Sequence, residues 1–344
     1  MMKRIFLILI TSCLYLSANA QQSDSLPALT DSLRTKYIPI TQQFKEHNIF
    51  QHLDASLTLG TTGIGFDVSS PITDWAQVRA GFSFMPHFHP MMRFEVQVGD
   101  NPSESAMKFQ NLSKALQEMT GYQVNNSVDM IGEPTYYNFN LLFDVFPFRQ
   151  NKHWHFTAGF YWGNSKIAKA YNTTEDMPSL VAVGIYNNMY EKAIRREPFI
   201  VVNMNGGTYV YTEDVELQDT YYEKFSQYGR MGVRLGEYVS DGTPYIIEPD
   251  ENSMVKAEVM ANSFKPYLGF GYGGRLFKGN DKYKISFDCG ALFWGGAPSI
   301  IAHDGTDLAK DVKIVNGKTR DYVEFIKNFK VFPIINLRIT RSLF

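Results

Sequence analysis

The sequence predicts an all-β fold, an antiparallel β-barrel of eight strands that spans a membrane. Three observations predict it: a secretory leader opens the chain, several segments of roughly ten residues alternate apolar and polar side chains, and aromatic residues concentrate on the apolar side of those segments. Of the 344 residues, 15% are aromatic and 44% are hydrophobic. Segments of about ten residues are long enough to cross a bilayer as strands tilted by about 45°.

The first twenty residues have the pattern of a secretory signal. Lys3 and Arg4 precede an apolar run, and Ala18 and Ala20 supply small residues where a signal peptidase reads the chain. Cleavage is therefore predicted after Ala20, leaving residues 21–50 as a periplasmic segment and residues 51–344 as the barrel. No later stretch approaches the roughly 18 consecutive apolar residues of a membrane-spanning helix.

Charge and cysteine content exclude two classes of protein. Loss of the two basic residues in the signal leaves 31 basic against 35 acidic side chains, a formal net charge of −4, so no global positive field holds nucleic acid. Cys289 would be the only cysteine of the mature chain. A single thiol cannot build a disulfide scaffold, so burial and backbone hydrogen bonds must stabilise the fold.

Eight segments make up the predicted barrel: residues 51–59, 63–69, 75–85, 135–147, 153–163, 264–277, 282–294 and 329–344. The glycines of residues 60–63 favour a turn between the first two. If residues 51–69 instead form one continuous strand, parity requires another strand within residues 164–263, for which residues 254–261 are the candidate. A barrel of ten or more strands is therefore the alternative.

Alternation along these segments is nearly unbroken. In residues 137–145 only Leu142 interrupts the polar face, which otherwise consists of asparagine and aspartate. A soluble β-sandwich or a lipocalin-like barrel also alternates and remains the alternative. The polar face mixes glycine and serine with single charges, and the apolar face is large and aromatic, which favours a small barrel with a polar interior. Aromatic residues at segment ends are candidates for two interfacial girdles: Trp75, Phe146, Phe148, Trp154, Trp162, Tyr283 and Trp294.

Three long connections, residues 86–134, 164–263 and 295–328, contrast with short polar turns at the opposite strand ends. Short periplasmic turns and long outer loops are typical of bacterial outer-membrane barrels. Within the connections, apolar spacing predicts helices over residues 103–119 and 178–196, and residues 199–203 and 208–212 resemble short strands. The loops are therefore expected to form an ordered extracellular cap with α-helical insertions.

Charged residues on the polar faces are predicted to meet inside the barrel. An ion network is the simplest way to fill a narrow interior, because an eight-stranded barrel is just wide enough for side chains. This width also argues against a general diffusion pore. The predicted network consists of Asp67, Arg79, Asp144, Lys284, Asp288 and Arg338.

Motifs for catalysis or cofactors are weak. Met85, His87, His89 and Met91 form a soft ligand set that could take copper, but loop packing explains them better and no metal is predicted. His153 and His155 flank a tryptophan of the predicted girdle, and this position explains them without a functional role. Residues 269–274 match a dinucleotide fingerprint in spacing, but a turn follows where the phosphate-binding helix should begin, so no cofactor is expected.

The signal ending Ala-Asn-Ala-Gln, the opening residues 57–67, the strand at 79–82 and the terminal Phe344 together resemble Bacteroidetes outer-membrane β-barrel proteins. The resemblance covers the signal and strands but not the loops. It implies that Phe344 is the signal read by the barrel-assembly machinery. Ile335, Leu337 and Ile339 are offset by one residue from Phe344, which a bulge near Arg341 would repair.

The same resemblance bears on residues 21–50. Two Asp-Ser-Leu triplets, at Ser25 and Ser32, are similar to the O-glycosylation acceptor of Bacteroidetes exported proteins. A plain unmodified lead segment is the alternative.

The functional interpretation is an integral barrel of the cell outer membrane that acts as a non-enzymatic surface, binding or structural protein through its cap. Its expected partners are outer-membrane lipid and lipopolysaccharide, the barrel-assembly machinery, and an extracellular ligand at the loops. The alternatives are a narrow porin or transporter of small solutes and, less favoured, a lipid hydrolase or acyltransferase whose triad is assembled from distant residues.

Overall fold

The computed structural model describes residues 52–99, 101–148, 150–203, 208–315 and 317–343. The predicted signal, the 21–50 segment with Ser25 and Ser32, and Phe344 lie outside the described residues. Within the described chain, no helix is both long and apolar enough to cross a membrane.

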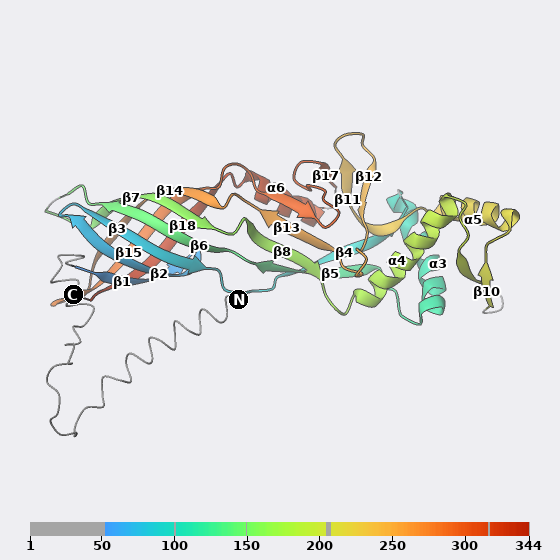
Figure 1. The fold of residues 1–344 in the computed structure, drawn as a ribbon, viewed down its shortest axis with the longest axis horizontal. Coiled ribbons are helices and arrows are strands. Elements are labelled where there is room, and N and C mark those ends of the chain that lie inside the picture. Colours follow the sequence, from blue (N-terminus) through green and yellow to red (C-terminus); the bar gives the residue numbers. More distant parts are fainter. Residues whose placement is uncertain (1–51, 100, 149, 204–207, 316, 344) are drawn as a thin grey trace, which may run out of the picture. The chain divides into compact units, whose positions relative to one another are not determined.

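A closed antiparallel barrel of eight strands forms the first part of the fold, in the order β1-β18-β15-β14-β7-β6-β3-β2. Figure 1 shows these strands running side by side at a common tilt. The predicted fold class is confirmed, and each strand lies within a few residues of its expected segment. The strands are β1 (Asp54–Gly60), β2 (Gly63–Thr73), β3 (Ala76–Phe84), β6 (Tyr137–Val145), β7 (Trp154–Gly163), β14 (Phe264–Phe277), β15 (Asn280–Phe293) and β18 (Val331–Ser342).

The alternative of ten or more strands is wrong. Gly60 pairs with Gly63 across the predicted turn, so residues 54–73 form two strands and not one. The candidate extra strand exists as β13 (Lys256–Met260), but it pairs with β8 (Lys166–Asn172) and β16 (Ser299–Ala302) in a second sheet. Ala257 and Val259 of this strand pack against the core of that second sheet and not against a lumen.

Side chains of the barrel are polar inside and apolar outside. Asp144 on β6 is fully buried, whereas its neighbour Phe143 is 46% exposed. The same contrast holds between buried Asp67 and Phe66, and between buried Asp288 and Phe287. A lipocalin-like barrel would have the opposite arrangement, because its apolar side chains would face a buried cavity.

The second sheet continues the barrel strands beyond one end of the barrel. Hydrogen bonds from Met85 N to Tyr136 O and from Thr135 N to Ile167 O carry the ladders across the junction. We call this sheet and its helices the cap. Its strand order is β12-β11-β4-β5-β8-β13-β16, with β17 beside β11; the further strands are β4 (Met91–Val98), β5 (Ser127–Pro134), β11 (Met231–Tyr238), β12 (Pro244–Ile247) and β17 (Val312–Ile314).

Both predicted helices are confirmed in the cap. α3 (Pro102–Thr120) begins after Asn101, whose side chain accepts a hydrogen bond from Ser103 N, and ends at Gly121 in the left-handed conformation. α4 (Met177–Ile194) buries one face of its turns. The cap also contains α5 (Val215–Tyr228), α6 (Gly317–Asn328) and a separate hairpin of β9 (Ile200–Asn203) and β10 (Thr208–Tyr211).

The cap has its own hydrophobic core. Tyr186 of α4 packs against Phe225 of α5 with ring centroids 5.4 Å apart, and α3 contributes Leu116, which is 1% exposed. Strands of the sheet complete the core with Val98, Val128, Met231 and Val233. The loops are therefore a folded module and not simple closures.

Most of the predicted girdle lies at the barrel surface, with two exceptions. Trp75, Trp154 and Trp162 are exposed on the outside. Trp294 instead is 6% exposed, because it lies at the base of the cap and its Nε1 donates to Phe329 O over 2.6 Å. Phe146 lines the lumen mouth beside His155. Sequence position alone could not separate outward rings from rings that turn inward at a strand end.

The last strand runs without the predicted bulge. β18 pairs continuously with β1 and β15, and Arg341 is opposite Ala55 on one side and Tyr283 on the other. Ile335, Leu337 and Ile339 face outward in step with Leu343. The strand therefore needs no correction of register up to the last described residue.

Candidate functional site

The barrel interior contains a buried ion network formed by four side chains from four strands. Arg79 of β3 lies 3.2 Å from Asp144 of β6 and 3.7 Å from Asp288 of β15. Arg338 of β18 lies 3.6 Å from Asp144 and 3.1 Å from Asp288. Each carboxylate thus meets two guanidinium groups, and all four residues are at most 5% exposed. These contacts link strands on different sides of the barrel and fill the lumen.

The other two predicted members are placed differently. Asp67 is buried near Arg79 and accepts a hydrogen bond from Thr58 over 2.8 Å. Lys284 does not join the network: its Nζ lies 3.2 Å from Asp54 at the open end of the lumen, where the lysine side chain is 53% exposed. Lys284 has the correct strand parity, but it stands four residues nearer the strand end than Asp288.

His155 belongs to the network, contrary to the expectation that its position alone explains it. Its Nε2 lies 2.7 Å from Asp288 Oδ1 and 3.3 Å from Arg338 Nη2. Thr157 and Gln77 add hydrogen bonds to Asp144. The sequence does indicate that His155 points into the lumen, because it shares the polar, inward face of β7 with Thr157.

Above the ion network, an apolar plug closes the cap end of the lumen. Leu142, the residue that interrupts the polar face of its strand, is 1% exposed within this plug. Tyr161 and Tyr267 meet edge to face with centroids 5.6 Å apart. The plug consists of Tyr136, Leu142, Tyr161, Tyr267, Leu292 and Ile334. Leu142 lies between buried Asn140 and buried Asp144 on the inward face of β6, so the alternation is interrupted at the level of the plug.

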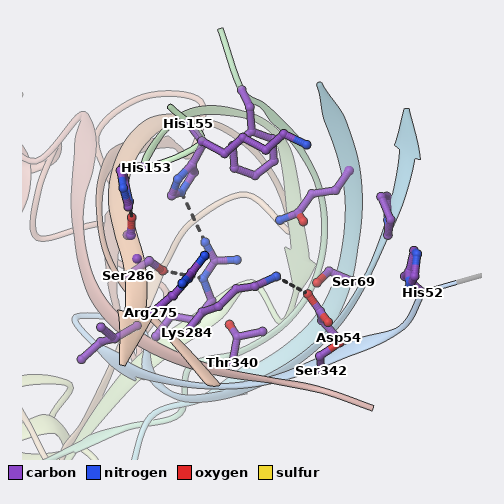
Figure 2. Close-up of a pocket in the computed structure, with 18 of the residues that line it drawn as sticks. His52, Asp54, Ser69, His153, His155, Arg275, Lys284, Ser286, Thr340 and Ser342 are labelled. Atoms are coloured by element: carbon purple, nitrogen blue, oxygen red, sulfur yellow. Dashed lines mark hydrogen bonds and ion pairs between the residues drawn. The ribbon is translucent and has the colours of Figure 1, made fainter. Parts of the chain in front are cut away.

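At the opposite end, the lumen opens into a vestibule with a volume of about 590 Å³. Figure 2 shows His153, His155, Lys284 and Thr340 around this space. His153 Nδ1 bonds to Gly273 O over 2.6 Å. The vestibule ends at Arg338 and His155, so the ion network forms its floor.

The glycines of the dinucleotide-like pattern lie in the barrel wall. They belong to the continuous strand β14, with no helix after them. A Cβ on Gly271 would lie 2.3 Å from Asp288 Oδ1 and 2.4 Å from His155 Nε2. The expectation that these residues are wall glycines is confirmed at this position, where only a missing side chain leaves room for the network.

Substituting Gly271 with alanine should lower the free energy of unfolding of the barrel by about 1–3 kcal/mol. The new methyl group would displace the Asp288 carboxylate and the His155 imidazole, which are hydrogen-bonded to each other. Gly65→Ala is the matched control, since its Cβ would make only ordinary contacts from 3.4 Å. Heat-induced unfolding in detergent micelles, followed on gels, measures both variants. Equal stability of the two would contradict the close packing at Gly271.

The weak metal candidates do not converge in the structure. His87 Nδ1 lies 3.1 Å from Glu133 Oε1 on β5, and its own side chain is 67% exposed. Met91 is 64% exposed at the start of β4. Across the described chain, no group of three or more His, Cys, Asp or Glu side chains is placed to hold a metal ion.

Glu133 is the centre of a polar cluster on the cap sheet. Lys169 on β8 lies 3.0 Å from Glu133 Oε2, and the Tyr171 hydroxyl donates to the same oxygen over 3.1 Å. The hydrogen bond from Lys169 holds the pKa of Glu133 below its usual value, and the bond from Tyr171 adds to this effect. The carboxylate thus stabilises the folded cap most strongly when ionised.

A lowered folded-state pKa makes this contribution dependent on pH with a definite sign. It is fully present above the unfolded value of about 4.3 and is lost as the pH falls through the lower folded value. Glu133→Gln should therefore destabilise the cap by up to about 1 kcal/mol at pH 7, and by less at pH 3. Thermal unfolding at the two pH values measures the difference. A penalty that grows on acidification would contradict the assignment.

Three solved structures are similar to this chain at low identity. Two are the crystal structures of Acinetobacter baumannii CarO2 and CarO, with 14% and 12% identity and TM-scores of 0.35 and 0.34. They cover 85% and 84% of this chain, which in turn covers 98% and 96% of them. The third is a major outer membrane protein from Thermus thermophilus, with 9% identity and a TM-score of 0.26, covering 85% of this chain and 98% of its own.

No protein-family model and no curated protein matches this sequence. The three structures described above come from Acinetobacter and Thermus, so they do not test the resemblance to Bacteroidetes proteins. The strand pairing of the chain itself establishes the barrel.

Proposed function

We propose that this protein is an integral barrel of the outer membrane whose sealed lumen makes it an anchor, and whose cap acts outside the cell as a non-enzymatic binding module. Exposed outward side chains such as Phe66, Phe156 and Phe287 support insertion, because only lipid would cover so many apolar groups favourably. Closure of the barrel supports it too, since every strand then finds backbone partners without water.

Orientation follows from the lengths of the connections. The turns at the vestibule end are short, and Leu343 N bonds to Leu53 O there. The long connections that build the cap leave from the other end. In bacterial barrels long loops lie outside and short turns face the periplasm. The vestibule is therefore assigned to the periplasmic side and the cap to the cell surface.

One observation carries the anchor interpretation: two successive layers fill the lumen. The network of Arg79, Arg338, Asp144 and Asp288 spans the lumen at one level, and the plug around Leu142 fills the next. Between them is a void of only about 10 Å³, close to the space of one water molecule. A solute would have to displace both layers, so the vestibule is a dead end.

Planar-bilayer recordings test this directly. The wild-type protein should give no discrete conductance steps. A quadruple variant should introduce small steps by opening a water path. Leu142→Ser and Leu292→Ser make the plug polar and smaller, and Arg79→Ser and Asp144→Ser remove one ion pair of the network. Regular steps from the wild-type protein would instead favour the narrow porin or transporter, to which the vestibule would belong as its inner mouth.

An outer-membrane lipid hydrolase or acyltransferase is the less supported alternative. The His155 Nε2 that would activate a nucleophile is occupied by Asp288 and Arg338 inside the lumen. Mass spectrometry of lipid A and phospholipids from cells with and without the protein would reveal such an activity. Unchanged lipids are expected.

The binding role is assigned to the cap because it folds around a separate core. Lipopolysaccharide and the barrel-assembly machinery are proposed as partners of the barrel, and an extracellular ligand as partner of the cap. A photo-cross-linking residue at Val215, which is 68% exposed on α5, should trap a defined partner on intact cells. The same residue at Phe277, by the turn between β14 and β15, is the control. Adducts of equal pattern at both sites would count against a cap-specific function.

A further inference from the structure

Helix α6 has two apolar sides, and the cap buries only one of them. Val323 is 6% exposed and belongs to the cap core, and Ile326 packs against that core one turn later. Tyr322 and Phe325, also one turn apart, are 54% and 61% exposed on the neighbouring side. An amphipathic helix that served only the cap would have no reason to place two large aromatic rings in solvent.

The end of α6 is fixed to the rim of the barrel. Phe329, just beyond the helix, receives the hydrogen bond from Trp294 Nε1, and its ring lies 4.4 Å from that of Phe325. Trp294 directly follows β15 and packs on Phe332 of β18 with centroids 5.1 Å apart. The tryptophan expected in the outer girdle therefore attaches α6 to the barrel.

This attachment makes the exposed rings continuous with the lipid-facing surface of the barrel. Val331, two residues after Phe329, is the first outward residue of β18 and pairs with outward Phe293 of β15. α6 ends at Asn328 and β18 begins at Val331, so the C-terminal end of the helix lies at the barrel rim, while its body packs beside β17 of the cap. Aromatic side chains at this level are typical of the boundary between hydrocarbon and headgroups.

Charge on the segment matches the same surface. Residues 317–330 contain four basic and two acidic side chains, whereas the whole chain has a formal net charge of −2. Arg320, Lys327 and Lys330 are exposed. Helices that lie in an anionic membrane interface typically combine basic residues with aromatic rings that insert into the lipid.

We propose that α6 is an interfacial helix, with Tyr322 and Phe325 inserted into the outer leaflet and its basic residues bound to the phosphate groups of the lipid there. This inference rests on the proposed insertion of the barrel into the outer membrane. It adds a second membrane contact, which holds the base of the cap against the lipid surface at the β15–β18 side of the barrel.

Site-directed spin labelling tests the proposal on the full chain reconstituted in liposomes that contain lipid A. Cys13→Ser and Cys289→Ser remove the two native thiols, and labels are then placed at Phe325→Cys, Phe287→Cys or Val215→Cys. Phe287 lies on the outward face of β15 and Val215 on α5 in the cap. The ratio of accessibility to oxygen, which concentrates in lipid, over a water-soluble nickel chelate should be several-fold higher at Phe325 than at Val215.

The controls separate the two levels of inference. An aqueous label at Phe287 would overturn membrane insertion itself. A lipid-exposed label at Phe287 with an aqueous label at Phe325, or one accessible to neither reagent because protein covers it, would overturn the interfacial role of α6 alone. Replacing lipid A by phosphatidylcholine should lower the ratio at Phe325. An unchanged ratio would overturn the role given to the basic residues, because phosphatidylcholine carries no net negative charge.

Discussion

Replacing Asp144 with alanine should destabilise the barrel by about 3–5 kcal/mol, because Arg79 and Arg338 would be left buried with one carboxylate fewer. Asp144 is 0% exposed, so water cannot compensate the lost charge without entering the lumen. The gel shift that separates folded from unfolded barrel, measured against temperature in detergent, should move to markedly lower temperature.

A matched pair substitution distinguishes charge from packing. Arg79→Met together with Asp144→Leu removes one guanidinium and one carboxylate and keeps most of the volume, so its cost should be smaller than that of Asp144→Ala. The coupling energy follows from a double-mutant cycle with the two single variants. A single variant as stable as the wild type would show that the network fills the lumen without contributing to stability.

The barrel strands were predictable because membrane strands keep one strict period. Lipid requires every outward residue to be apolar, and a lumen of this width requires most inward residues to be polar, so alternation marks both bounds and parity. The C-terminal strand shows the limit of this reasoning: the parity of Ile335 to Leu343 was correct, but the bulge inferred near Arg341 was not. The actual register depends on pairing with both neighbouring strands, which one strand's pattern does not specify.

An ion network inside the barrel could be predicted from the sequence, but not the full set of residues that form it. Parity selects the inward charges, yet it does not give their depth, so Lys284 groups with Asp288 in the sequence although it lies at the vestibule. His155 has the correct parity, but its place beside a girdle tryptophan hides its role. Depth in a barrel depends on the stagger between strands, which is a property of the closed sheet and not of any one segment.

The cap was predicted as helices and short strands, but its sheet was not. Segments such as β4 and β8 continue barrel strands beyond the membrane level, so their short alternating patterns were assigned to loops. Their pairing partners are far apart in sequence, as with β4 and β11. Pairing between such distant segments is what stabilises these strands, and local patterns do not specify it.

Replacing Tyr186 with alanine should destabilise the cap by about 3–5 kcal/mol and leave the barrel folded. Tyr186 is 2% exposed, packs against Phe225, and donates its hydroxyl to Gly229 O over 2.8 Å. Its pKa is raised because burial disfavours the phenolate, so this donor persists across the working pH range. The loss should appear as faster proteolysis and hydrogen exchange over α4 and α5, with an unchanged heat-induced gel shift of the barrel.

Tyr186→Phe is the control, because it keeps the ring and removes only the hydrogen bond, at an expected cost of about 1 kcal/mol. Two separate cores make this selective effect reasonable, since the cap packs around Tyr186 and the lumen around its own network and plug. If the alanine variant also lowered the unfolding temperature of the barrel by the same amount, cap and barrel would be one cooperative unit. The anchor would then require its cap to fold, and the separation of roles proposed above would be wrong.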